Sequence, residues 1–141
     1  MSWDGIGDTI SRILQKVNYK VNVLNYVDDS GLQVADIIVG FKHFGYEIEP
    51  PQGKKFDHYC GDDVYVKTTE KYEQDSSLEE IRKNVLKELE DGTSETAQFA
   101  DKITRRVLSN QLETCWNLAV SYDCLNFESQ IIRSGLWDGI F

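Results

Sequence analysis

The sequence predicts an α+β fold in which a small antiparallel sheet packs against a C-terminal antiparallel helix pair and a short N-terminal helix. Two observations support this fold: apolar residues recur at helical spacing between Ser77 and Tyr122, and they alternate with polar residues in several earlier segments. The connections between the expected strands are also too short for crossover helices, which favours antiparallel pairing. A chain of 141 residues is long enough for one domain, here 1–141, with its own core.

The first expected element is a short amphipathic helix at residues 8–17. Its apolar positions follow the i, i+3, i+4, i+7 pattern of one helical face: Ile10, Ile13, Leu14 and Val17. Residues 19–27 then alternate as expected for a half-buried strand, and residues 28–31 (Asp-Asp-Ser-Gly) have the composition of a turn.

Residues 32–44 are compatible with either a helix or a strand. The apolar positions between Val34 and Phe41 fit a helix, whereas the β-branched content and the preceding turn fit the second strand of a hairpin. We favour the strand. Residues 46–49 alternate like the end of a strand before two prolines, and residues 64–68 predict a further half-buried strand.

The segment from Ser77 to Tyr122 predicts two helices. Ser77 and Glu80 have the spacing of a capping box, and Gly92 follows the last apolar position of the first helix. Thr93 or Ser94 can cap the second, longer helix. A break of two to four residues predicts that the two helices are antiparallel neighbours. A further short helix is expected near residues 127–132.

The chain is acidic, with 24 Asp and Glu against 15 Lys and Arg and a formal charge of −9. Such a surface repels phosphates, so direct nucleic-acid binding is disfavoured and a protein partner with a basic surface is favoured. The plainer interpretation is a solvated helix surface. No apolar run of about 18 residues and no basic leader is found, so no membrane association is expected. Three unevenly spaced cysteines indicate reduced thiols and a cytoplasmic location.

The densest polar cluster lies at residues 57–63 and contains His58, Cys60 and Asp62. These residues could ligate a metal, or Cys60 could act as a nucleophile with His58 as its base. No second pair of ligands occurs at a suitable interval, so we favour a hairpin turn at residues 60–63. With no recognisable catalytic motif elsewhere, we expect no catalytic residues, no cofactor and no metal site.

Candidate partner-binding residues come from two features. One is an acidic belt, which consists of the Asp and Glu residues between Glu70 and Asp101, and the other is the tetrapeptide Trp-Asp-Gly-Ile, which occurs near both ends of the chain. Tryptophan is a frequent binding anchor, although chance is the favoured explanation of a four-residue repeat. The candidates are Glu73, Asp75, Glu79, Glu80, Glu88, Glu90, Asp91, Trp3 and Trp137.

These observations favour a small non-catalytic interaction protein that occludes a basic protein target. Concrete forms are a phage-encoded anti-CRISPR inhibitor of a nuclease and an immunity protein against a toxin. One alternative is a small enzyme or ligand-binding domain that uses the cluster of His58, Cys60 and Asp62. Another is a structural or assembly protein of a phage or cellular complex, for which a homo-oligomer is possible.

Overall fold

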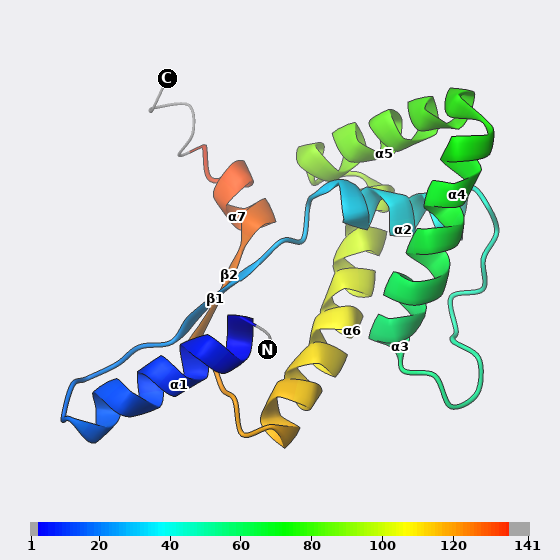
Figure 1. Ribbon diagram of the computed structural model, residues 1–141. Helices are drawn as coiled ribbons and strands as arrows, with labels where there is room; N and C mark the ends of the chain where they lie inside the picture. The colour runs from blue at the N-terminus through cyan, green and yellow to red at the C-terminus, as the bar shows by residue number, and fades with distance from the viewer. Residues whose placement is uncertain (1–2, 136–141) are drawn as a thin grey trace.

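The computed structural model describes residues 3–135, and most of them are helical (Figure 1). The elements in chain order are α1 (Trp3–Lys16), β1 (Leu24–Val27), α2 (Leu32–Lys42), α3 (Phe56–His58), the π-helix η1 (Tyr59–Tyr65), α4 (Val66–Gln74), the 3₁₀-helix η2 (Ser76–Leu78), α5 (Glu79–Asp91), α6 (Glu95–Asn117), β2 (Cys124–Phe127) and α7 (Glu128–Arg133). Helices α2 to α6, with η1 and η2, form a group that we call the helical body. The segment 3–27 and the strand β2 extend from it, and we call them the arm.

Helix α2 lies at the centre of the helical body and contacts α4, α5, α6 and η1. Its side chains Ala35, Ile38 and Val39 are completely buried, and even Asp36 is only 2% exposed. A helix that is covered on most sides has no polar face to mark its period. The predicted strand at residues 32–44 is therefore wrong, because an apolar run of this kind does not distinguish a buried helix from a buried strand.

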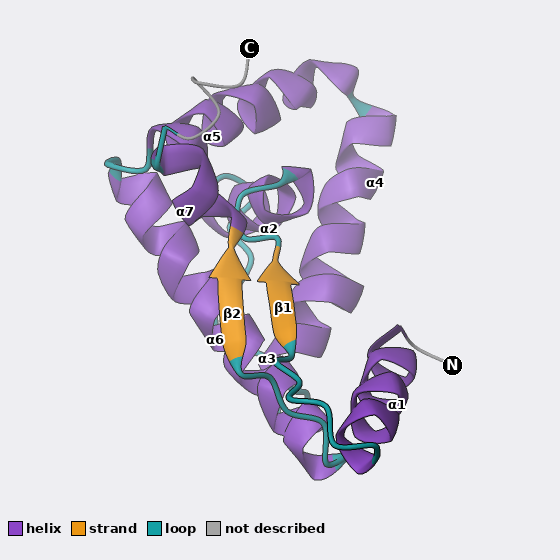
Figure 2. Cartoon of the chain, turned by 90° about the vertical axis from the view of Figure 1, so that its left-hand side faces the viewer, coloured by secondary structure: helices purple, strands orange, loops and turns teal. Residues whose placement is uncertain are grey.

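The sheet has two strands among the described residues, and they are parallel rather than antiparallel (Figure 2). Leu24 pairs with Cys124 and Val27 pairs with Phe127. The predicted antiparallel sheet is wrong because the helical body lies between the two strands in sequence and provides the long crossover that parallel pairing needs. Residues 64–68, predicted as a strand, belong to η1 and α4, and residues 46–49 form a loop.

The ends of the two long helices are close to those predicted. Gly92 ends α5 with a left-handed φ of 73°, and the Ser94 hydroxyl accepts a hydrogen bond of 3.0 Å from the Ala97 N–H at the start of α6. Ser77 does not begin α5, because Asp75 caps the 3₁₀-helix η2 that precedes it. The helices are not antiparallel: α5 crosses the end of α6 at a wide angle (Figure 1).

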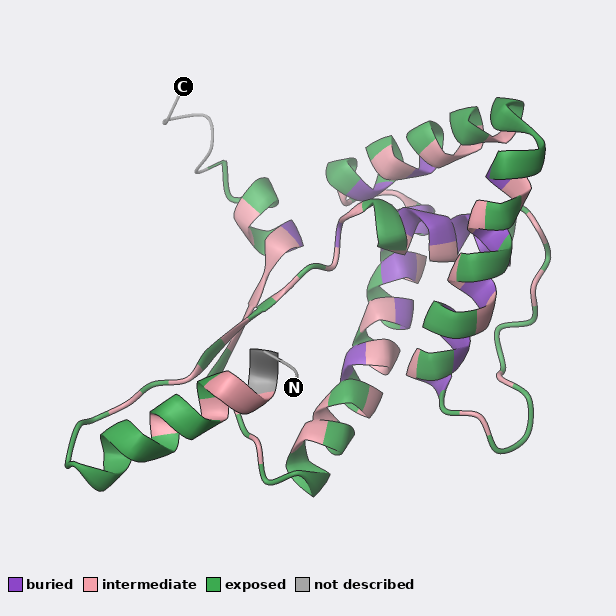
Figure 3. Ribbon diagram, viewed as in Figure 1, coloured by how far each residue is buried: buried purple, intermediate pink, exposed green. Residues whose placement is uncertain are grey.

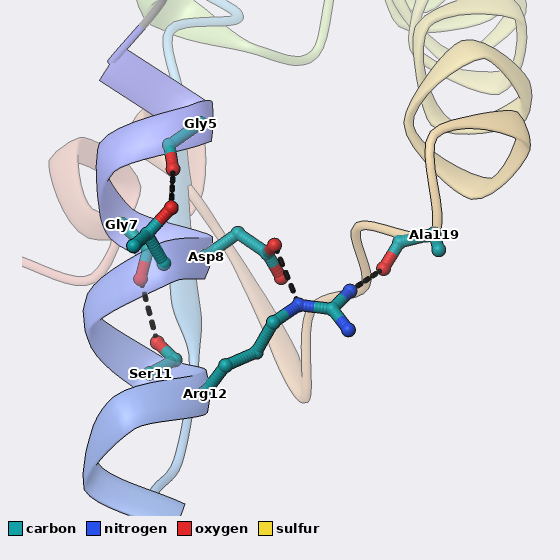
Figure 4. A network of polar contacts seen from close by, with 7 residues as sticks. Gly5, Gly7, Asp8, Ser11, Arg12 and Ala119 are labelled. Carbon is teal, nitrogen blue, oxygen red and sulfur yellow. Dashed lines mark hydrogen bonds and ion pairs between the residues drawn. The ribbon is translucent and has the colours of Figure 1, made fainter.

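The arm buries little of its apolar surface (Figure 3). Apolar side chains that are more than half exposed recur along the segment 3–27 of the arm: Ile10, Ile13, Val17, Tyr19, Leu24 and Tyr26. One polar link holds α1 to the segment after α6, where Arg12 pairs with Asp8 at 2.7 Å and donates a hydrogen bond to the Ala119 carbonyl (Figure 4). Among residues 3–135, no helix is both long and apolar enough to cross a membrane.

Candidate functional site

A pocket of about 300 Å³ lies where the arm meets the helical body. Strand β1 and the turn after it form one wall, and α2, the α3–η1 junction and α6 form the others. The lining residues are Asn25, Tyr26, Val27, Asp28, Gln33, Val34, Ile37, Asp57, Cys60, Gly61, Ile103, Thr104, Val107, Leu108 and Gln111. Ligands of open α/β sheets bind at the carboxyl ends of parallel strands, and this pocket adjoins that end of β1.

The pocket combines apolar walls with side chains that accept hydrogen bonds. Aliphatic side chains of α2 and α6 form the walls, while three amide side chains and the carboxylates of Asp28 and Asp57 provide oxygen atoms. None of the lining residues is Lys, Arg or His. The Oδ1 atom of Asp57 is buried and has no hydrogen-bond partner among the described residues, which costs free energy unless a donor reaches it.

A second group of polar side chains joins the carboxyl ends of the two strands. Glu128, directly after β2, accepts hydrogen bonds from the Tyr26 hydroxyl at 2.9 Å and from the Ser30 hydroxyl at 2.8 Å. Asp29, the second residue after β1, accepts hydrogen bonds from the N–H and the hydroxyl of Ser129, at 2.8 and 2.5 Å. These reciprocal contacts fix the two strand ends against each other.

The acids at these strand ends have pKa values shifted in opposite directions. The hydrogen bonds from Ser30 and Tyr26 lower the pKa of Glu128. Burial, and then the hydrogen bond and charge of Glu128, raise the pKa of Asp28. The strand ends therefore hold one carboxylate that is stabilised in its ionised form beside one that takes up a proton more readily.

The side chains of the cluster of His58, Cys60 and Asp62 do not point to one place. Cys60 is 1% exposed and faces the core, and burial raises its pKa to about 12, so the thiol remains protonated at neutral pH. His58 and Asp62 are exposed one helical turn apart, with Nδ1 and Oδ2 separated by 3.5 Å. The predicted hairpin turn is also wrong, because residues 60–63 lie within η1. No group of metal ligands is found in the part of the chain that the structure describes.

The acidic residues predicted to bind a partner all lie on the surface of the helical body. Glu73, Asp75, Glu79, Glu80, Glu88, Glu90 and Asp91 are exposed. Trp137 and the side chain of Trp3 lie outside what the structure describes. No observation tests a contact role for these residues, so that role stays a prediction.

Sequence reasoning missed the acids at the strand ends. The composition of residues 28–31 indicates only a turn, and the local sequence does not single out Glu128. The available signal was the position of polar residues directly after an apolar strand, where parallel strands bring their carboxyl ends together. That signal has meaning only once the two strands are known to be parallel.

Comparison with known proteins gives a consistent result. A family model described as "tRNA synthetases class I (R), catalytic domain" matches residues 4–132. The chain is similar to arginine–tRNA ligases, with 33% identity over 141 residues to that of Thermococcus kodakarensis, covering 94% of this chain and 22% of the relative. The ligase of Thermus thermophilus is 34% identical over 134 residues, covering 93% and 20%, and that of Borreliella afzelii is 31% identical over 133 residues, covering 94% and 23%.

These similarities overturn the predicted function. The matched relatives are ligases and the matched model is a catalytic domain, so the predictions of a non-catalytic inhibitor, an immunity protein or an anti-CRISPR protein are wrong. The exclusion of nucleic acid is also wrong for a family of tRNA synthetases. The chain spans about a fifth of the length of these relatives, so its charge of −9 does not describe the surface of a whole synthetase.

Proposed function

This chain belongs to the family of class I tRNA synthetase (R) catalytic domains, and we propose that it forms part of an arginine–tRNA ligase. In this role it contributes two parallel strands and an inserted helical body to a larger catalytic domain that joins arginine to tRNA. The observation that carries the proposal is the similarity to arginine–tRNA ligases over 94% of this chain but only 22% of the relative. The predicted cytoplasmic location is part of the same proposal.

The sheet supports a role within a larger structure. Parallel sheets are normally covered on both faces, and two strands alone are marginally stable in water. Here Leu24 and Tyr26 on one face of β1 are 62% and 56% exposed. Further strands and a covering layer would bury these side chains.

Helix α1 supports the same conclusion. Ile10, Ile13 and Val17 lie on one face of the helix or directly after it, and each is more than half exposed. An apolar stripe of this kind normally packs against a core. A neighbouring part of a longer catalytic domain would provide that core.

The proposal is tested with a chimera of the Borreliella afzelii ligase, in which residues 4–132 of this chain replace the matching segment. We expect the chimera to attach radiolabelled arginine to tRNA, because the segment supplies the same strands and helical body. The ligase with the segment deleted is the control and should be inactive.

Thermal unfolding of the chimera separates a failure to fold from a failure to function. A chimera that unfolds as cooperatively as the parent ligase but attaches no arginine would contradict the proposal. The isolated chain is expected to attach none, because it spans about a fifth of the relatives' length.

A further inference from the structure

We propose that residues 47–53 form a strap that opens as a unit, and that the ion pair between Glu49 and Arg106 is the latch that holds it closed. The strap is the central part of the long connection between α2 and α3 (Figure 1). It forms one side of a cavity of about 490 Å³, whose other side belongs to η1 and α4. Opening the strap exposes the inner wall of this cavity, and the movement is measured without any ligation reaction.

The chain is held firmly on both sides of the strap. Before the strap, the Tyr46 N–H donates a hydrogen bond of 3.1 Å to the Gly40 carbonyl, and the Tyr46 ring packs on Phe44 with ring centroids 6.3 Å apart. After the strap, the Phe56 N–H donates a hydrogen bond of 3.1 Å to the Asn110 side chain, and Phe56 is only 3% exposed. The strap can therefore move while the helices on either side of it stay in place.

The strap itself buries little surface. Its residues are exposed except for Pro50, which is partly buried. Segments with few buried contacts open locally at a small cost in free energy. Pro50 and Pro51 fix two consecutive φ angles at the middle of the strap, and Gly53 follows with a left-handed φ of 83°. The strap therefore combines a stiff centre with a permissive hinge at its C-terminal end.

Among the residues that the structure describes, two polar contacts join the strap to the helical body. The Tyr59 hydroxyl donates a hydrogen bond of 2.7 Å to the Glu47 carbonyl. The Glu49 carboxylate accepts two hydrogen bonds from the Arg106 guanidinium, at 2.8 and 2.7 Å. Two-point pairs between arginine and a carboxylate are stronger than single hydrogen bonds. The hydrogen bonds from Arg106 also lower the pKa of Glu49, so the latch is charged at neutral pH.

Arg106 is suited to hold the strap because its guanidinium is itself fixed to the helical body. The guanidinium lies over the Phe56 ring, 4.0 Å from the ring centroid. Arg105, the preceding residue, pairs instead with Asp101 on the same helix at 2.8 Å. Arg106 therefore joins two separate parts of the chain, whereas Arg105 joins one helix to itself, and the two arginines form a matched pair for an experiment.

The test is limited proteolysis of the chain with trypsin, read at Lys54 and Lys55, which directly follow the strap. Proteases cut mobile, exposed segments, and the rate follows the population of the open state when opening is fast. We expect Glu49→Gln to raise the rate by about two- to fivefold, the effect of losing one exposed ion pair. Glu47→Gln is the matched control, because Glu47 contacts the helical body through its backbone carbonyl, and it should leave the rate unchanged.

A double-mutant cycle shows whether the two residues of the latch act together. Arg106→Gln should raise the rate at least as much as Glu49→Gln, since it also removes the contact with Phe56. The two changes together should raise it by less than the product of their single effects. Arg105→Gln should leave the rate unchanged, because Arg105 does not contact the strap.

Cleavage after Lys87, within α5, separates opening of the strap from unfolding of the helical body, and it should be the same in Glu49→Gln as in the unchanged chain. The proposal is overturned if Glu49→Gln leaves cleavage after the strap unchanged, if Glu47→Gln or Arg105→Gln raises it equally, or if the effects of the two latch changes multiply. If Arg106→Gln fails to fold, Glu49→Gln and its control decide the outcome by themselves.

Discussion

The helical body and the arm bury their apolar residues to very different extents. In the body, Ile38 and Val39 are completely buried and Val85 is 2% exposed. In the arm, Ile13 and Val17 are 59% and 57% exposed, although they belong to the same class of side chain. The comparison indicates that the body provides its own core, whereas the arm has an apolar surface that still needs a partner.

The two regions also differ in how their charges are used. In the body, the buried Asp36 accepts a two-point hydrogen bond from Arg82 at 2.7 and 3.0 Å, which ties α2 to α5. In the arm, the Arg12–Asp8 pair lies at the surface and joins residues of one helix. Exposed pairs of that kind contribute little to stability.

The largest expected effect comes from Arg82→Ala in the body. The change leaves the Asp36 carboxylate buried without its partner, which should lower the free energy of unfolding by about 3–5 kcal/mol. Denaturant unfolding measures this value. Lys83→Ala is the matched control, because Lys83 pairs with Glu80 at the surface and should change stability by less than about 0.5 kcal/mol. Equal effects of the two variants would remove the distinction between buried and exposed pairs.

An intermediate effect is expected from Glu128→Gln, where the arm is attached to the body. Loss of the charged acceptor for Tyr26 and Ser30 should weaken the pairing of β2 with β1 by about 1 kcal/mol. Hydrogen exchange of the β1 and β2 amides measures the change. Protection that stays the same would show that the sheet does not depend on this carboxylate.

The attachment of the arm should also depend on pH. Folding lowers the pKa of Glu128, so its ionised carboxylate stabilises the folded state fully above about pH 4.5, which corresponds to its ordinary pKa. This stabilisation is lost as the pH falls through the lowered pKa of the folded state. The raised pKa of Asp28 acts in the opposite direction. Hydrogen exchange of the β1 and β2 amides should therefore be measured in two proteins that both carry Asp28→Asn, one with Glu128 and one with Glu128→Gln. Acid should weaken the protection of these amides in the protein with Glu128 and have less effect in the protein with Glu128→Gln.

The smallest effect is expected from Ile13→Ala in the arm. Ile13 is 59% exposed, so this change should alter the free energy of unfolding by less than about 0.5 kcal/mol. The same change at the fully buried Ile38 should cost about 2–5 kcal/mol. In the chimeric ligase, Ile13→Ala should lower the free energy of unfolding by a larger amount than in the isolated chain. An equally small cost there would show that no other segment covers this face.

The sequence predicted those parts of the fold that depend on neighbouring residues. The end of α5 at Gly92 and the cap of α6 at Ser94 were recognised because glycine and serine have local conformational and hydrogen-bonding roles at helix ends. Helix α1 was also predicted, although it begins at Trp3 rather than near residue 8. Gly5 and Gly7 disfavour an earlier start by propensity alone, and the structure overrides that preference.

The parts that depend on distant residues were not predicted. The strand at Leu24 pairs with Cys124, and nothing within either segment indicates its partner or the parallel direction. Helix α2 lacks a polar face because it is central, so its apolar run resembled a strand. The pocket gathers residues from four separate regions, such as Asn25, Gln33, Asp57 and Gln111, so no single motif marks it.

The pairing of Leu24 with Cys124 also affects the order of folding. Each helix of the helical body forms from neighbouring residues, whereas the sheet can form only after the intervening chain has been synthesised, and long-range parallel pairing is slow. Until β2 arrives, β1 presents unpaired backbone groups beside exposed apolar side chains, which is a recognised hazard for aggregation. The sheet is therefore expected to form after the helices, and the unpaired edge of β1 is where misassembly is expected to begin.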